Sequence, residues 1–275
     1  MLTSTRTFLL LAAAVAPIAT TGCASMIDRT LGSAGDAAGQ RIGTSIGNSA
    51  GDAIAPAAGS ATAAAMGGQY MTIYTSYIFG LAFSSGGYAI STRDYQPGEY
   101  TRFSLPASDG TQNTIERARL FDDANGNQWW KVKYTEGKKG EVIILEGLLS
   151  PKDQRMVRLR GKFPKDEAAK EMPVDEQSYY VPPRRLSRES IEGATVGTET
   201  VTTPAGTFKG ARHVVFGDAG GNSHEWWLDD KVPGGAVRQA LKSTSRQAGN
   251  GPDAGNYVMS LVAYGSDAKS DLGTR

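Results

Sequence analysis

The stretch that decides the fold class is Arg155-Met156-Val157-Arg158-Leu159-Arg160. Successive side chains alternate across a β-strand, so Val157 and Leu159 would share one face while Arg158 and Arg160 share the other. Met156 is out of phase with this alternation. A strand with one apolar face and one charged face is typical of an antiparallel sheet that is covered on a single side. The sequence therefore predicts that residues 155–163 form one strand of such a sheet.

Eight further segments have β-prone composition and are bounded by turn signals. They are residues 99–105, 115–121, 128–134, 141–149, 195–202, 208–216, 223–228 and 257–264. Helical patterns in this part of the chain are short, at residues 166–171 and 233–241. We expect a mainly β protein with a curved antiparallel domain over residues 93–267 and a disordered tail at 268–275.

Two tryptophan pairs, Trp129-Trp130 and Trp226-Trp227, each follow a glycine-containing turn. Adjacent residues of a strand face opposite sides, so one tryptophan of each pair should enter the core or a cavity. One interpretation is ordinary packing. The other is an apolar pocket lined by Trp129 or Trp130, Trp226 or Trp227, Phe208 and Val215.

A stripe of glycines precedes the β domain, at Gly35, Gly39, Gly43, Gly47 and Gly51. Each glycine costs a helix about 1 kcal/mol relative to alanine, so such a helix needs a partner that packs closely on its flat face. The stripe resembles the glycine-zipper segments of bacterial envelope proteins. The alternative is a flexible linker, although linkers do not keep a fixed register.

Residues 53–92 contain no charged residue, and Pro56 should end the first helix. The apolar residues of segment 70–83 have the spacing of one face of a second helix, and the same segment also alternates acceptably as a strand. We interpret residues 34–83 as a Gly/Ala-rich helical hairpin whose second arm could enter a bilayer. We expect residues 23–92 to self-associate or to bind an envelope protein.

An apolar run at residues 8–19 leads to Thr20-Thr21-Gly22-Cys23, which contains the only cysteine of the chain. The run is shorter than the ~20 residues that span a bilayer as a helix. A thiol preceded by a small residue resembles a bacterial lipoprotein signal, although Thr20 departs from the leucine that the family prefers. The resemblance implies removal of residues 1–22 and acylation of Cys23, which would anchor the protein in a membrane. The alternative is a plain secretory signal with an incidental buried cysteine.

The residue directly after this cysteine is Ala24 and not an acidic residue. By resemblance to known lipoproteins, this implies an outer-membrane location, and we expect the protein to face the periplasm. The formal net charge of the chain is only +1, which gives no electrostatic reason to expect a nucleic-acid partner. With two histidines and one cysteine, a His/Cys metal cluster is excluded.

Residues 201–235 follow a recognisable order: a strand, Thr203-Pro204-Ala205-Gly206-Thr207-Phe208, a second strand, a turn, a strand with two tryptophans, and a Val-Pro-Gly loop. This order resembles uncharacterised bacterial envelope lipoproteins, whose sheets are similar to the curved half-barrels of lipoprotein and lipid carriers. The resemblance implies a half-barrel-like sheet and brings no catalytic residues.

No catalytic pattern stands out in the sequence. Ser223-His224-Glu225 contains the letters of a triad, but neighbours on a strand face opposite sides and cannot form a relay. Asp122, Asp123 and Asn125 occupy a tight turn, where a turn-stabilising role is favoured over a calcium site. We therefore expect no enzymatic activity and no cofactor.

Two functions remain from these observations. The first, which we favour, is a structural or assembly component of the cell envelope. The alternative is a periplasm-facing carrier that holds a lipid ligand in an apolar cavity of its β domain. A one-sided apolar sheet with few helices motivates the alternative, because such a face must be covered by something.

Overall fold

The computed structural model describes residues 67–274, except 86, 108–109, 175–179, 181, 219–220 and 243–255. Cys23, the predicted lipidation site, lies outside the described residues, as do the glycine stripe at residues 35–51 and Pro56. The described part is mainly β, and eleven strands form one open antiparallel sheet.

The order of the strands across the sheet follows the chain closely, because most neighbours are joined as hairpins. In spatial order the strands are β7 Lys170–Met172, β6 Met156–Lys162, β5 Val142–Leu149, β4 Gln128–Thr135, β3 Gln112–Asp122, β2 Tyr100–Pro106, β13 Tyr257–Gly265, β12 Ala236–Lys242, β11 Ser223–Leu228, β10 Gly206–Gly217 and β9 Thr195–Thr203. All nine predicted strands are present. Both predicted short helices are wrong. Residues 166–171 form no helix and lead into β7, and residues 236–241 belong to β12, which is hydrogen-bonded between β11 and β13.

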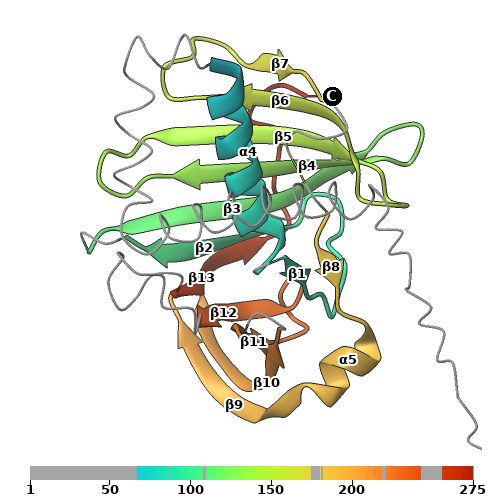
Figure 1. Ribbon diagram of the computed structural model, residues 1–275, viewed down its shortest axis with the longest axis vertical. Helices are drawn as coiled ribbons and strands as arrows, with labels where there is room; N and C mark the ends of the chain where they lie inside the picture. Colours follow the sequence, from blue (N-terminus) through green and yellow to red (C-terminus); the bar gives the residue numbers. More distant parts are fainter. Residues whose placement is uncertain are drawn as a thin grey trace, which may run out of the picture. The chain divides into compact units, whose positions relative to one another are not determined.

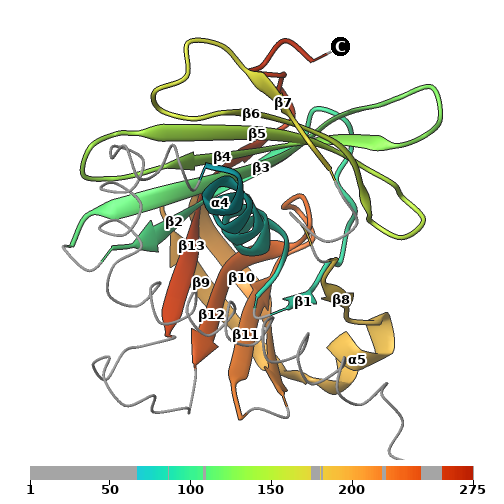
Figure 2. The ribbon, with the colours of Figure 1, turned by 45° about the horizontal axis from the view of Figure 1, so that its top comes forward.

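Helix α4, Gly67–Phe83, covers one face of this sheet and contacts β3 and β4 (Figure 1). Figure 2 shows it end-on, in the angle between strands β2–β7 and strands β9–β13. Ile78 and Phe79 are completely buried there. We call the face that α4 covers the inner face and the opposite one the outer face. The helix thus belongs to the core of the β domain, and the predicted boundary at residue 92 runs through that core.

None of the helices in the described part of the chain is long and apolar enough to cross a membrane.

Gly147 of β5 explains how closely α4 approaches the sheet. A Cβ atom at Gly147 would lie 3.2 Å from the ring of Phe79, so glycine leaves room for that ring.

Strand β6 carries a correction to the alternation predicted for it. Leu149 pairs with Met156 and Leu148 pairs with Arg158, so Val157 is an extra bulged residue. As a result Met156 is buried, while Val157 is 44% exposed, the reverse of the prediction. Leu159 lies in the core, as expected.

The outer face of β2–β7 carries a ladder of alternating charge. Each charged residue lies opposite one of the other sign on the next strand. The pairs are Arg102 with Glu116, Glu116 with Lys133, Lys131 with Glu146, Glu146 with Arg160, and Arg160 with Glu171. Opposite charges on adjacent strands stabilise their pairing, so the ladder helps to fix the register of this half of the sheet.

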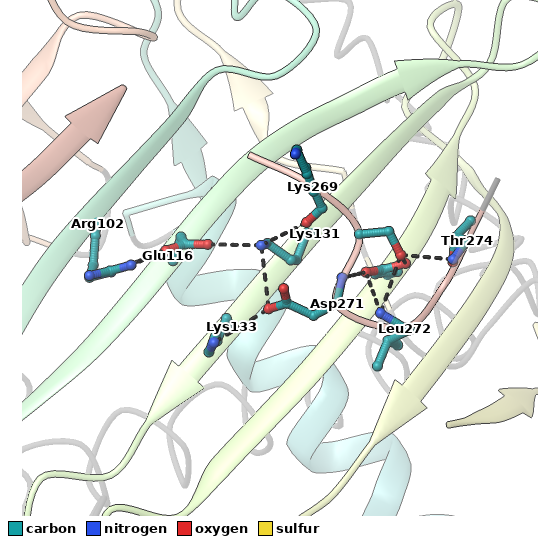
Figure 3. Close-up of polar contacts among 10 residues, drawn as sticks. Arg102, Glu116, Lys131, Lys133, Lys269, Asp271, Leu272 and Thr274 are labelled. Atoms are coloured by element: carbon teal, nitrogen blue, oxygen red, sulfur yellow. Dashed lines mark hydrogen bonds and ion pairs between the residues drawn. The ribbon is translucent and has the colours of Figure 1, made fainter. Parts of the chain in front are cut away.

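The C-terminal residues lie on this ladder (Figure 3). Glu146 is fully buried and accepts hydrogen bonds from the Ser270 hydroxyl and from the backbone N–H groups of Asp271 and Leu272. Lys131 donates to the Lys269 carbonyl and pairs with Asp271 at 3.4 Å. The prediction that residues 268–275 are disordered is therefore wrong for 268–274, because buried charges of the sheet bind this segment.

The Thr203–Phe208 motif forms the tight connection between β9 and β10. The Thr203 hydroxyl accepts a hydrogen bond from the Ala205 N–H, which also donates to the Leu261 carbonyl of β13 at 3.2 Å. Phe208 is buried in the main core. The motif therefore folds the β9–β10 hairpin back onto β13.

Candidate functional site

A cavity of about 290 Å³ opens beside the last turn of α4. Its walls come from the end of α4, the segment that follows it, the second half of β3, the start of β4 and the β5–β6 connection. The remaining wall is formed by Tyr180, Pro183 and Arg185. The aromatic side chains among them are Phe83, Tyr95, Trp130 and Tyr180, and the charged ones are Asp94, Arg117, Arg119 and Arg185. The lining therefore carries three cationic side chains and one anionic side chain.

Arg117 lies at the centre of this arrangement. Its guanidinium carbon is 4.6 Å from the ring centroid of Tyr95 and 5.4 Å from that of Phe83. Its Nε and Nη2 donate to the Tyr95 hydroxyl at 3.1 and 2.8 Å. No carboxylate within the described ranges forms an ion pair with Arg117. The cation is therefore held by two aromatic rings and a neutral hydroxyl, which leaves its charge uncompensated.

The other two arginines are partnered. Arg119 pairs with Asp122 at 2.7 Å, and its Nη1 donates to the Tyr95 carbonyl. Arg185 is largely exposed and lies 3.7 Å from Asp94, which is even more exposed. Exposed pairs of this kind contribute little, so Arg185 adds positive potential at the cavity mouth and little stability.

Tyr180 contributes a neutral hydroxyl to the same wall. Burial raises the pKa of Tyr180 to about 12, although Arg117 and Arg185 oppose the shift. The hydroxyl therefore stays protonated at neutral pH and is available as a hydrogen-bond donor.

The Val-Pro-Gly loop explains how the Arg117 side chain is positioned. Gly234 has φ +75°, and a Cβ atom there would lie 2.6 Å from the Tyr95 ring and 3.0 Å from Arg117 Nη2. Its N–H donates to the Arg93 carbonyl, which holds the loop against the segment containing Tyr95. Glycine at this position satisfies both the left-handed backbone and the close contact.

Sequence reasoning missed Arg117, although a signal was present. Ile115, Arg117 and Arg119 occupy alternate positions, so they share a face of β3. Ile115 is buried in the core, which places the arginines on the apolar face. A charged residue at an inner position is unusual enough to indicate a site.

The tryptophan pairs divide as expected. Trp130 and Trp226 face inward and belong to the main core, whereas Trp129 belongs to a small apolar cluster on the outer face. Trp227 stacks on His213 at 4.5 Å. Trp130 lines the arginine cavity, and Trp226 lines a separate cavity of about 30 Å³.

The remaining residues of the predicted apolar pocket lie elsewhere. Phe208 is packed in the core, while Val215 is only half-buried, because Val214 takes the inward position of β10. The six residues of the prediction do not line a common pocket in the described part of the chain. Neighbouring tryptophans and valines alternate between faces, which separates residues that the sequence places together.

The two glycine turns share one hydrogen-bonding scheme. Asp123 accepts from the backbone and side-chain nitrogens of Asn127, and Asp218 accepts from the same two atoms of Asn222. Burial opposes ionisation of Asp218, but hydrogen bonds from Asn222 and His224 outweigh it and lower its pKa to about 2. Within the described ranges no cluster of His, Cys, Asp and Glu could hold a metal ion. The aspartates stabilise the turns.

His224 is not part of a Ser-His-Glu relay. Its ring is completely buried, with Nε2 3.1 Å from Asp218 Oδ2. Glu225 points to the other face, where Lys242 pairs with it. The geometry therefore agrees with the argument made from the alternation of the strand.

Comparison of the sequence with protein-family models and with curated proteins gave no match.

Proposed function

We propose that this protein is a non-enzymatic lipoprotein that acts as a structural or assembly component of the bacterial cell envelope. In this proposal Cys23 is acylated, the protein is anchored in the outer membrane, and the β domain faces the periplasm. The glycine stripe at residues 35–51 mediates contact with a second copy or with another envelope protein.

The observation that best supports a structural role over lipid carriage is the position of α4. A half-barrel carrier needs an open apolar inner face on which an acyl chain can lie. Here the helix of the protein itself covers that face, and Phe83 packs edge-on against Trp130 with ring centroids 5.3 Å apart. The curved sheet is half-barrel-like in this proposal, and α4 occupies the space in which the acyl chain of a carrier would lie.

Lipid extraction distinguishes the two functions. The full chain is purified from envelopes in a neutral detergent, and bound lipid is quantified by mass spectrometry. The structural proposal predicts no stoichiometric lipid beyond the acyl groups covalently attached to Cys23. One equivalent of a noncovalent lipid that survives washing would favour the carrier.

Cross-linking in intact envelopes tests the role of the glycine stripe. Wild-type chain should give a discrete higher-mass adduct, and Gly43→Leu should reduce it, because the larger side chain separates closely packed helices. Gly217→Ala in the β domain is the control, since Gly217 does not have a positive φ and nothing lies within 4 Å of a Cβ at that position. Monomers alone for wild type and Gly43→Leu alike would contradict the proposal.

A further inference from the structure

The arginine cavity has the features of a ligand site that the structural role does not use. Arg117 is partly buried against Phe83 and Tyr95, and no described carboxylate neutralises it. A buried or half-buried charge costs free energy unless it is paired. A protein that only needed to fill this space would gain from an apolar side chain, so the uncompensated cation calls for a functional explanation.

The donors of Arg117 are only partly used. A guanidinium carries five N–H donors in a planar fork, and here Nε and Nη2 both end on the Tyr95 hydroxyl. Nη1 makes no hydrogen bond to any residue that the structure describes. Because the fork matches the oxygens of a carboxylate or a phosphate, the remaining donors suit an oxyanion.

The walls of the cavity indicate what else the ligand contains. The cavity wall contains the aromatic rings of Trp130, Tyr95 and Phe83. The Trp130 ring contacts the other two, with its centroid 5.2 Å from that of Tyr95 and 5.3 Å from that of Phe83. Aromatic walls with a few convergent polar groups are typical of small-molecule sites. A volume of about 290 Å³ corresponds to roughly ten water molecules, which suits a small ligand and not a long acyl chain.

The charge around the cavity agrees with an anionic ligand. Arg185 stands at the mouth with its side chain 63% exposed, and Asp94, the single acidic residue of the lining, is 77% exposed. Asp94 is therefore solvated, whereas Arg117 is partly shielded from water, so the field inside the cavity is positive.

We propose that this cavity binds a small oxyanion, a carboxylate or a phosphate attached to an aromatic or short apolar body. Arg117 binds the anionic group, Arg185 attracts it at the mouth, and the rings of Tyr95 and Trp130 contact the body. The site goes beyond the structural role and does not depend on acylation of Cys23.

Titration calorimetry tests the site on the full chain in phosphatidylcholine nanodiscs. The probes are phenyl phosphate and benzoate, with inorganic phosphate lacking the apolar body and benzyl alcohol lacking the charge. Saturable binding of at least one aromatic anion is expected, tighter than inorganic phosphate, with no binding of benzyl alcohol. The stronger of the two aromatic anions identifies the head group as phosphate or carboxylate. No saturable binding of either would overturn the proposal.

Variants locate the binding. Arg117→Gln should weaken the affinity about 10- to 100-fold, the effect of losing a charge-assisted hydrogen bond. Arg185→Gln should weaken it about two- to fivefold and, because that side chain is exposed, should leave the thermal midpoint unchanged. Arg188→Gln is the matched control, since Arg188 is 87% exposed on the short helix α5 (Arg188–Gly193) and pairs only with Glu192 among the described residues.

A folding defect is separated from a binding defect by the same set. If Arg117→Gln unfolds, Arg117→Lys keeps the charge but loses the fork, and it should still bind more weakly than wild type. Equal affinity in wild type, Arg117→Lys and Arg185→Gln would place the anion elsewhere and overturn the proposal.

Discussion

Glu146 and the C-terminal segment provide the most direct test of how the outer face is stabilised. The Glu146 carboxylate is fully buried and receives three hydrogen bonds, from the hydroxyl of Ser270 and the N–H groups of Asp271 and Leu272. Its cross-strand neighbours are Lys131 and Arg160, but their ion pairs go to other carboxylates, Lys131 to Glu116 and Asp271 and Arg160 to Glu171. The perturbation that removes the charge and keeps the shape is Glu146→Gln.

The expected loss in the free energy of unfolding follows from the three hydrogen bonds to Glu146. A hydrogen bond to a charged group contributes ~1.5–3 kcal/mol and one between neutral groups ~0.5–1.5 kcal/mol, so each of the three should weaken by about 1 kcal/mol. Because such effects are not fully additive, Glu146→Gln should lower the free energy of unfolding by about 2–3 kcal/mol. Urea unfolding of the full chain, followed by tryptophan fluorescence, measures this loss.

Two further chains make the measurement specific. Glu141→Gln should change stability by less than about 0.5 kcal/mol, because that half-buried side chain makes no ion pair to a described residue. In a chain that ends at Ala268, Glu146→Gln should cost much less, since the three donors are already absent. An equal cost with and without the C-terminal residues would refute the reasoning.

Three other predictions concern the core, the glycine loop and acid stability. Phe79→Ala should destabilise the protein by about 3–5 kcal/mol in urea unfolding, since it removes a fully buried ring from α4; a loss below 1 kcal/mol would mean that α4 does not pack on the sheet. Gly234→Ala should cost clearly more than Gly110→Ala, because both have positive φ but only the first meets the Tyr95 ring; equal losses would contradict this contact. The pKa of Asp218 is about 2, below the unfolded value of about 3.9, so its contribution is present above pH 4 and lost as pH falls toward 2. Asp218→Asn should therefore lose less stability than wild type between pH 5 and 2, and an unchanged acid profile would argue against a depressed pKa.

The strands were predictable from sequence because their signals are local. Alternating polarity and turns rich in Asp, Asn and Gly are local signals, and they locate every long strand except β12. Residues 236–242 of β12 include Ala, Gln and Leu, which also suit a helix, and only hydrogen bonding to β11 and β13 decides the outcome. Val157 shows the same limit, because a bulge depends on the partner strand as well as on the residue itself.

The candidate site was not predictable in the same way. The cavity joins Phe83 of α4, Tyr95 of the following loop, Arg117 of β3 and Trp130 of β4. These residues meet only after the sheet has bent around α4. The C-terminal segment was misassigned for a related reason. Its composition suggests disorder, and its order comes from buried charges more than 100 residues away in sequence, with Glu146 and Ser270 separated by 124 positions.

The proposed function depends most on the membrane anchor, and the intact mass of the mature protein tests it directly. The chain is recovered from cell envelopes, separated into membrane and soluble fractions, and measured by mass spectrometry beside a Cys23→Ala variant. The proposal predicts a membrane-bound chain that begins at Cys23 and carries acyl groups, which the variant lacks. A soluble periplasmic product with an unmodified Cys23 thiol would contradict it.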